Sequence, residues 1–380
     1  MMSDGVDSFE TGKTMALHVV DGLGGAAPEV VLFYATVNHD LETLLRGLRA
    51  TLPEATRVIG CSTQGVMTHG CVLEEGYAAG AIAFAGIPVS IARVDDIDVD
   101  TRAKGAALGD ALCAGQADPP KVVVLLWDPL CGADMDQLLA GLDARVACPI
   151  IGGAAGQNHA AMVKTFQACG DLVFSRGAVA MALGGDATYE MSCSAGTSPV
   201  GVEMTVTRAD GNHVLELDGR PALDVWMELA SSGPPSVDHT AALALGIPVA
   251  PGSDAYFVRA AFGVDRERKG VILQAGIESG TRVMLHHRTV GDLFDGTAEM
   301  ARALRSRLVG KTIRAVLGFE CGARTGPFLG AAEALRENTE LQAALGGTTW
   351  LGMMAWGELY PTSGRPAFHN YSYPLLVIAD

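Results

Sequence analysis

The sequence lacks the short motifs by which many enzymes and metal proteins are identified. No two of its eight cysteines are spaced C-x-x-C, no H-x-x-x-H occurs, and there is neither a P-loop nor a G-x-G-x-x-G after a predicted strand. The one adjacent histidine pair, His286–His287, falls in a predicted strand, where neighbouring side chains point to opposite faces. We therefore expect no metal site, no dithiol redox centre and no dinucleotide-binding fingerprint.

Basic residues are scarce as well. Lys and Arg together number 27 against 43 Asp and Glu, which gives a formal net charge of −16. A chain of this charge repels phosphate backbones and anionic lipid headgroups. The composition therefore argues against a nucleic acid or a membrane as the partner.

Long apolar runs are also missing. The longest, residues 77–89, is too short to span a bilayer, and the first 14 residues lack the apolar stretch of a signal peptide. Most of the cysteines lie in apolar runs, where a free thiol behaves as a small hydrophobic group. These features predict a cytoplasmic location with reduced cysteines.

What the sequence does contain is enough apolar material for more than one core. Hydrophobic residues make up 49% of the 380 residues, and a length of roughly 150 residues per domain predicts two domains. Residues 1–13 are polar and are expected to form a disordered tail. We divide the chain into a tail and first segment (1–26), an N-terminal lobe (27–225) and a C-terminal lobe (226–380).

One strand–helix–strand pattern occurs three times along the chain. A continuous apolar run precedes a helix with apolar residues at i, i+3, i+4 and i+7, and a second strand then leads into a glycine-rich turn. The recurrence fits either descent from one unit or the general similarity of βαβ units. The strand, helix and strand fall at residues 30–36, 41–48 and 57–65; at 121–127, 135–142 and 148–156; and at 313–319, 328–335 and 348–358.

Antiparallel strands are predicted between these units. The dipeptide Asp210–Gly211 between residues 202–209 and 212–218 is a strong hairpin signal. Residues 231–238 read as a linker or loop, a helix is expected around Leu293 to Leu308, and the chain ends on a strand at 373–379. The predicted fold class is α/β with two lobes, each a mixed, largely antiparallel β-sheet with packed helices, containing βαβ-like units.

Three loops at the ends of predicted strands are candidate ligand-binding elements. Ligands of α/β layers bind where strands deliver their carboxyl ends into loops, so we expect the three loops to lie on one side, at a cleft between the lobes. Glycine there allows close approach of the backbone to a ligand, although a tight turn under a helix needs the same residues. The candidates are Gly60, Cys61, Ser62 and Thr63 in the first loop, Gly152, Gly153 and Gly156 in the second, and residues 352–358 in the third.

The segment FECGAR, residues 319–324, offers a possible anion site. Arg324 is predicted near a helix N-terminus, where its guanidinium would be available to a carboxylate or phosphate of a ligand. A surface ion pair is the structural alternative. Cys321 would be a nucleophile only with a histidine beside it, and the sequence cannot place His369 there. A thiol-dependent enzyme stays a minor alternative, and we expect no catalytic activity.

Further candidates lie in the last 30 residues. With a strand's period of two, Trp356, Glu358 and Tyr360 share a face that would suit an amine or a flat apolar group. Asn370, beside His369, adds a donor and an acceptor that could orient the ligand. A structural cap or turn is the alternative for both polar residues.

These segments, in their order, resemble the FIST family of sensory domains. The N-terminal half is similar through VVLFYAT, RVIGCSTQG and PIIGGAAGQ, and the C-terminal half through FECGAR, GMMAWGELYP and FHNYSYP. The segment at 199–226, with its Asp–Gly–x–Pro–Ala turn, resembles the family's linking stretch. The resemblance covers roughly residues 27–380.

The resemblance implies a small-molecule-binding sensory protein with no enzymatic activity. Amino-acid-like ligands are proposed for the family, and some bacterial members bind haem, sense nitric oxide and act on histidine kinases. Because no C-x-x-C-H is present, haem would be bound non-covalently. No F-box, kinase, cyclase or methyl-accepting segment is recognised, so we expect the signal to reach a separate partner protein such as a histidine kinase.

Overall fold

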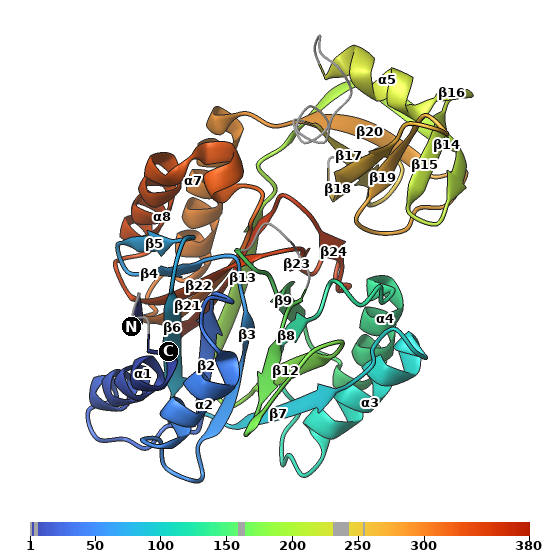
Figure 1. Ribbon diagram of the computed structural model, residues 1–380. Helices are drawn as coiled ribbons and strands as arrows, with labels where there is room; N and C mark the ends of the chain where they lie inside the picture. Colours follow the sequence, from blue (N-terminus) through green and yellow to red (C-terminus); the bar gives the residue numbers. More distant parts are fainter. Residues whose placement is uncertain (1, 4–6, 159–163, 231–242, 254) are drawn as a thin grey trace. The chain divides into compact units, whose positions relative to one another are not determined.

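The computed structural model describes residues 2–3, 7–158, 164–230, 243–253 and 255–380 (Figure 1). These residues form two compact units. The first contains Met1–Cys193, Ala298–Ala367 and Tyr373–Asp380, and the second contains Ser194–Thr297 and Phe368–Ser372. The predicted α/β class, with mixed and largely antiparallel sheets and packed helices, is confirmed. The loop predicted at 231–238 lies outside the described residues.

Three copies of one pattern build the first unit (Figure 1). The first repeat consists of β1 (Met2–Ser3), α1 (Ser8–Gly22), β2 (Val30–Ala35), α2 (Leu41–Arg49), β3 (Arg57–Ser62), β4 (Val66–Thr68), β5 (Cys71–Leu73) and β6 (Ala79–Phe84). The second consists of β7 (Val89–Val94), α3 (Thr101–Cys113), β8 (Val122–Trp127), α4 (Met135–Val146), β9 (Ile150–Ala154), β10 (Gln167–Cys169), β11 (Leu172–Phe174) and β12 (Ala178–Leu183). The third consists of β13 (Thr188–Ser194), α7 (Val290–Arg307), β21 (Ile313–Cys321), the π-helical turn η1 (Thr325–Leu329), α8 (Ala331–Ala344), β22 (Thr349–Ala355), β23 (Glu358–Leu359) and β25 (Tyr373–Ala379).

Each repeat has a parallel strand pair at its centre. The pairs are β2–β3, β8–β9 and β21–β22, which confirms the three predicted strand–helix–strand units. The return strands β6, β12 and β25 run antiparallel to the first strand of their own pair. Outside them lie β1, β7 and β13. The equivalence therefore extends well beyond a single βαβ unit.

The repeats are tied together by a cyclic exchange of short strands. β10 of the second repeat pairs with β3 of the first, β4 of the first pairs with β22 of the third, and β23 of the third pairs with β9 of the second. Every sheet of the first unit thus contains a strand from a neighbouring repeat. No repeat can complete its sheet alone, so we expect the three to fold cooperatively.

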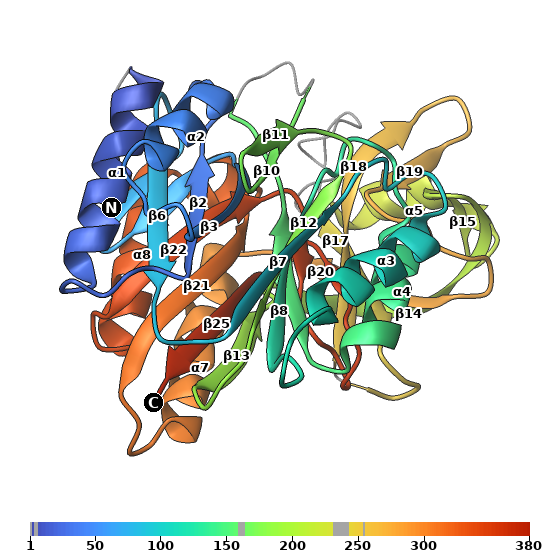
Figure 2. The same ribbon diagram turned by 90° about the horizontal axis from the view of Figure 1, so that it is seen from below.

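The core of the first unit is built from equivalent positions of the three sheets. Alternate side chains of each first strand enter one cluster, because strand side chains alternate between faces. The members are Val30, Leu32 and Tyr34 of β2, Val122, Val124 and Leu126 of β8, and Ala315, Leu317 and Phe319 of β21. The intervening residues face outward, and helix pairs such as α1–α2 and α3–α4 cover these outer faces (Figure 2).

A glycine in α1 and another in α3 allow the pairs α1–α2 and α3–α4 to cross closely. A Cβ on Gly12 would lie 2.1 Å from the carbonyl oxygen of Leu44, and one on Gly105 would lie 2.1 Å from that of Leu138. The sequence-based expectation of a disordered tail over residues 1–13 is wrong for residues 8–13, which belong to α1. The Asp7 carboxylate accepts hydrogen bonds from the backbone of Phe9 and Glu10 and so caps this helix.

The second unit is an antiparallel sheet inserted between β13 and α7. Strand β14 pairs with both β20 and β15, so the order β14-β20-β17-β18-β19-β15 closes on itself. The predicted hairpin at Asp210–Gly211 is confirmed, with Asp210 opposite His213. The elements are β14 (Ser198–Asp210), β15 (His213–Leu217), β16 (Arg220–Pro221), α5 (Ala222–Leu229), β17 (Leu243–Pro248), β18 (Tyr256–Asp265), β19 (Gly270–Leu273), β20 (Arg282–His287) and β24 (Phe368–His369).

Candidate functional site

The three predicted loops meet in the first unit. The Gly156 amide donates to the Ser62 carbonyl (3.0 Å), the Gln64 amide donates to the Met354 carbonyl (3.3 Å), and the Ala154 amide donates to the Gly357 carbonyl (2.8 Å). The loops lie together because each follows the second strand of a parallel pair and the exchanged strands bring the three pairs into contact. We call residues 62–65, 154–158 and 354–358 the loop junction.

Glycine allows the strands and loops to approach one another at this point. A Cβ on Gly156 would lie 2.9 Å from the Gln64 nitrogen, and one on Gly152 would lie 2.0 Å from the Leu125 oxygen. Gly60 is confined in the same way by the backbone of Phe33, and Gly153 by the side chain of Ala355. The space beside these glycines is filled by the protein's own chain, which agrees with the structural alternative for them.

Half-buried polar side chains connect the loops. The indole Nε1 of Trp356 donates to Oε1 of Gln64 (2.9 Å). The Nε2 of Gln64 donates to the carbonyl of Gly322 (2.9 Å) and to a carboxylate oxygen of Glu74 (3.3 Å). The network thus joins the first loop, the third loop and the FECGAR segment through one glutamine.

The Glu74 carboxylate is held by donors at the start of η1. It accepts hydrogen bonds from the Gly326 amide (2.8 and 3.1 Å) and from the hydroxyl of Thr325. Asn158, from the second loop, donates to the carbonyls of Glu74 (3.2 Å) and Gly76 (3.3 Å). All three loops therefore contribute to one polar assembly, which can offer donors and acceptors to a small polar molecule.

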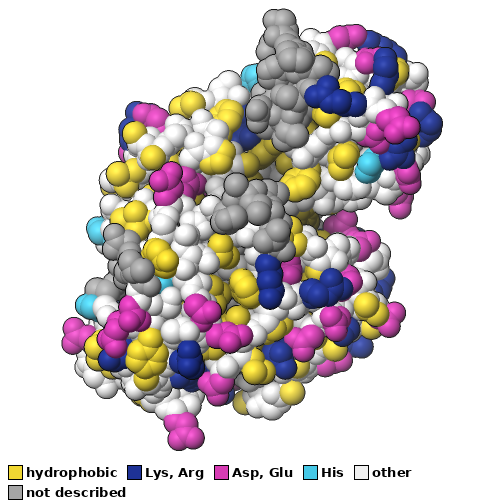
Figure 3. Space-filling view, in the orientation of Figure 1, with side chains coloured by type: hydrophobic (Ala, Val, Ile, Leu, Met, Phe, Trp, Pro, Cys, Tyr) yellow, Lys and Arg dark blue, Asp and Glu magenta, His cyan; other side chains and the backbone are white. Residues whose placement is uncertain are grey.

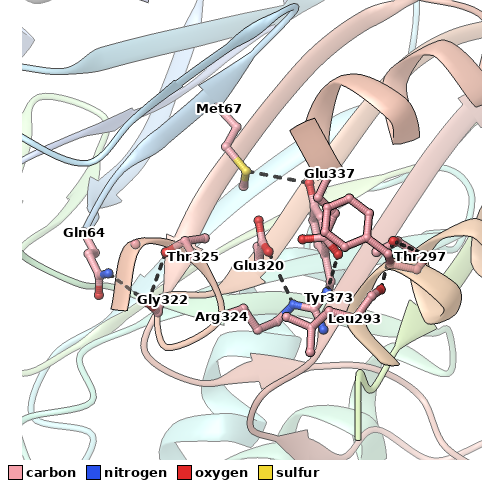
Figure 4. Close-up of polar contacts among 12 residues, drawn as sticks. Gln64, Met67, Leu293, Thr297, Glu320, Gly322, Arg324, Thr325, Glu337 and Tyr373 are labelled. Carbon is pink, nitrogen blue, oxygen red and sulfur yellow. Dashed lines mark hydrogen bonds and ion pairs between the residues drawn. The ribbon is translucent and has the colours of Figure 1, made fainter. Parts of the chain in front are cut away.

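Arg324 lies in a different environment from the one expected. Its side chain is fully buried and pairs with Glu320 (3.3 Å) and Glu337 (2.8 Å), and its guanidinium lies over the Tyr373 ring (Figure 4). The expectation that the guanidinium is available to an anionic ligand is therefore corrected, and the ion pairs are buried rather than on the surface. Burial, followed by the nearby Glu337 carboxylate, raises the pKa of Glu320 well above its ordinary value.

The same ion pairs explain an incorrectly predicted helix face. Apolar spacing placed Phe328, Ala332 and Leu335 against the core, but Leu335 is 41% exposed and the helix begins only at Ala331. The buried face of α8 carries Glu337, which pairs with Arg324, and Gln342, which bonds to the backbone of residues 68 and 70. Polar partners, rather than apolar spacing, set the orientation of α8.

The remaining candidates of the first unit are buried. Burial raises the pKa of Cys61, which therefore stays a neutral thiol, and Cys321 is 5% exposed at the end of β21. Glu358 is fully buried opposite Gly153 and accepts a hydrogen bond from the Gly357 amide (3.2 Å). Ser62 is buried too, and its hydroxyl accepts from the Phe166 amide (2.9 Å).

His369 and Asn370 belong to the second unit and have structural partners there. The Asn370 side chain accepts from the Ala260 amide (3.0 Å) and donates to Gln274 (2.6 Å), while its backbone amide donates to the Val258 carbonyl (3.0 Å). His369 packs against the Phe257 ring. Asn370 therefore anchors the segment Phe368–Ser372 to β18.

Two surface hollows of the described residues can be compared with the needs of haem. One open surface hollow lies on α3 and α4, around Arg102, Asp110 and Arg145, and a smaller one lies around Pro88 and Gly184. Neither is lined by a His, Cys, Tyr or Met that could ligate haem iron. Within the described part of the chain, no group of three His, Cys, Asp or Glu residues could hold a metal ion. On the face drawn in Figure 3, Lys and Arg lie scattered among Asp and Glu.

Two domain families match consecutive parts of the chain. The FIST N domain matches residues 29–220, and the FIST C domain matches residues 222–361. Together they account for nearly the whole chain. The chain belongs to the FIST family. FIST domains are associated with sensory signal transduction, and the resemblance read from the sequence is confirmed.

Proteins similar to this chain occur in mycobacteria and in Methanocaldococcus jannaschii. Uncharacterized protein Rv0628c of Mycobacterium tuberculosis (strain H37Rv) is 23% identical over 96% of this chain and 95% of its own length. Uncharacterized protein Mb0898c of Mycobacterium bovis is 28% identical over 49% of this chain and 50% of its own, so the match spans about half of that relative. Uncharacterized protein MJ1623 of Methanocaldococcus jannaschii is 26% identical over 59% of this chain and 44% of its own length.

Both FIST segments contribute to the loop junction, and some of its residues were missed by sequence analysis. Gln64, Glu74, Asn158 and Thr325 were not among the candidates, although all four take part in the polar assembly. Gln64 directly follows a candidate loop residue, and that position was the available signal. Nothing in the sequence pairs Glu74 with η1. None of the helices described here has the length and apolar character needed to cross a membrane.

Proposed function

We propose that this FIST protein senses a small polar molecule at the loop junction of its first unit and passes the signal to a separate protein. The observation that carries the proposal is the network in which Gln64 links Trp356, Gly322 and Glu74. It brings convergent donors, acceptors and an aromatic ring together at the carboxyl ends of three strand pairs. Sites at such strand ends bind ligands in many α/β proteins.

Partial exposure supports the choice of these residues. Gln64, Glu74, Asn158 and Trp356 are half-buried, so a molecule can reach them, yet each is oriented by hydrogen bonds. Fixed polar groups of this kind give a ligand its orientation, and an aromatic side chain supplies apolar contact area. Arg324 is less suited to binding a ligand, because its side chain is fully buried and its guanidinium is engaged in ion pairs with Glu320 and Glu337.

The chain connects the loop junction to the second unit by a short path. β23 follows Trp356 directly, and the chain then reaches Phe368–Ser372, which Asn370 anchors in the second unit. A ligand that repositions Trp356 would shift β23 and pull on this anchored segment. The second unit is therefore the proposed output element, and a histidine kinase is one class of partner that could read it.

The proposal includes a cytoplasmic protein without catalytic activity. All eight cysteines are free, which supports a reducing compartment. The thiol-dependent alternative is not favoured, because its candidate nucleophile Cys321 is only 5% exposed. The haem sensor is not favoured by either of the two surface hollows described above.

A thermal-shift titration tests the proposal. The panel contains the amino acids, their amides and small polar amines, and the proteins are the wild type, Gln64→Met and the control Gln137→Met, whose glutamine is exposed on α4. We expect at least one compound to raise the Tm of the wild type and the control, with the shift lost in Gln64→Met. Equal shifts in all three proteins, or no shift in any, would overturn the proposed site.

A further inference from the structure

A row of polar side chains lies inside the core of the first unit. Tyr34 of β2 is in register with Cys61 of β3, which is in register with Gln167 of β10. Tyr34 and Cys61 belong to the central core cluster, and Cys169, two residues after Gln167 on the same face, packs against it. The three side chains, which we call the polar row, therefore point into the interior shared by the three sheets.

The repeats show that this position is unusual. Gln167 occupies the exchanged strand opposite Cys61, and the equivalent residues of the other two sheets are Glu358, opposite Gly153, and Val66, opposite Met353. Only the third sheet keeps an apolar residue there. Two of the three exchanged strands thus carry a polar side chain into the core, at the level just below the loop junction.

Two members of the row, Tyr34 and Gln167, have polar atoms without a hydrogen-bond partner among the described residues. Tyr34 and Gln167 are both 0% exposed, and within the described part of the chain nothing is placed to hydrogen-bond the Tyr34 hydroxyl or either polar atom of the Gln167 amide. A buried amide or hydroxyl without a partner is strongly destabilising, and most such groups in proteins are satisfied by protein, water or ligand. Three unsatisfied atoms in one row point to a polar occupant.

The row spans three neighbouring strands. Neighbouring strands lie about 4.8 Å apart, so β2 and β10, on either side of β3, are separated by about 10 Å. The Tyr34 and Gln167 side chains are long, and the Cys61 side chain between them is short. Ser62, the next residue along β3, and Phe166, the residue before β10, are joined by a hydrogen bond of 2.9 Å, so the loop junction begins directly beyond the row.

We propose that the polar row binds a small uncharged molecule with a carboxamide-type group. A group with an adjacent donor and acceptor satisfies both polar atoms of Gln167 at once, and the Tyr34 hydroxyl takes a second polar atom. A buried anion is disfavoured, because the equivalent position of the second sheet holds the buried Glu358 carboxylate and the row has no basic side chain. The inference rests on the proposed function, since it places the ligand's polar end beneath the loop junction.

The sign of a stability change tests whether the row is occupied. Removing a polar group that lacks a partner stabilises a protein, whereas removing one that is satisfied destabilises it. The variants are Tyr34→Phe and Gln167→Met, with Gln137→Met as the exposed control, and the probes are acetamide and propionamide, with acetate as the charged counterpart. Thermal unfolding of the full chain is measured with and without each probe.

We expect both buried variants to have a lower Tm than the wild type, and the amides, but not acetate, to raise the Tm of the wild type and not of Gln167→Met. A higher Tm in the variants would overturn the proposal by showing an empty row. A lower Tm without an amide-dependent shift would overturn it in favour of enclosed water. In either case the proposed function would stand if, in the thermal-shift titration described above, the ligand-dependent rise in Tm is lost in Gln64→Met and kept in Gln137→Met.

Discussion

Trp356 and Gln64, 292 positions apart in the sequence, are joined by a hydrogen bond of 2.9 Å from the indole nitrogen to the side-chain oxygen. The bond forms because the third repeat supplies Trp356 after β22, while β4, which follows Gln64, pairs with that same β22. The cyclic strand exchange is thus what creates the candidate site. No single repeat contains it.

Gly156→Ala tests how closely the loops must approach. A Cβ at this position would meet the Gln64 nitrogen at 2.9 Å and the Met354 oxygen at 3.2 Å, so the loops must move apart. We expect a loss of about 1–3 kcal/mol in the free energy of unfolding, typical of overpacking, together with loss of the ligand-dependent thermal shift. Gly22→Ala is the control, because a Cβ there has nothing within 4 Å. A Gly156→Ala protein that unfolds and responds like the wild type would show that the loop contact is not required.

Apolar patterning was sufficient to predict the three strand–helix–strand units, because buried runs such as β2 and β8 are continuous. The exchanged strands β4, β10 and β23 could not be predicted. They have only two or three residues each, too few for a period, and nothing local specifies which repeat they join. Convergence of the loops was therefore a correct prediction, while the reason for it became visible only in the structure.

The partners of Arg324 could not be predicted from the residues around it in the sequence. An arginine near a helix start suggests an anion site, but its partners Glu320 and Glu337 lie 4 and 13 residues away and reach it only when α8 packs on β21. Likewise, Asn370 reads as a ligand contact in sequence, yet its partners are Ala260 and Gln274. Tertiary packing, which the local sequence does not show, brings Arg324 to Glu337 and Asn370 to its two partners.

Arg324→Met is predicted to destabilise the protein severely. The substitution leaves two carboxylates, Glu320 and Glu337, buried without a counter-charge. Breaking a buried ion pair in this way costs about 3–5 kcal/mol, and urea unfolding of the first unit measures it. Adding Glu320→Gln and Glu337→Gln should restore part of the loss. A single variant of nearly wild-type stability would contradict the structural role and revive a role in ligand binding.

Glu320 is predicted to make stability depend on pH. Its pKa is raised in the folded protein, so the folded state holds the proton more tightly than the unfolded chain, where the pKa is about 4.3. The favourable contribution is present below that value and is lost as pH rises toward the raised pKa. Urea unfolding between about pH 4.5 and 8 should show the wild type losing stability relative to Glu320→Gln as pH increases. Parallel curves would mean that the pKa is not raised.

Asn370→Ala is predicted to release the anchored segment. The side chain satisfies the buried Ala260 amide and bonds to Gln274, so its removal leaves a buried donor unpaired. We expect a loss of about 1–3 kcal/mol and faster amide hydrogen exchange at residues 368–372. Exchange that is unchanged at this segment would contradict its role as the connection to the second unit.

Native mass spectrometry of the protein as purified tests the central claim most directly. The wild type, Gln64→Met and Gln137→Met are compared under native and denaturing conditions, so that a bound molecule appears as a mass difference lost on unfolding. Binding at the loop junction predicts one small molecule per chain in the wild type and in Gln137→Met, and none in Gln64→Met. Identical spectra for all three proteins, with the extra mass present or absent throughout, would contradict the claim.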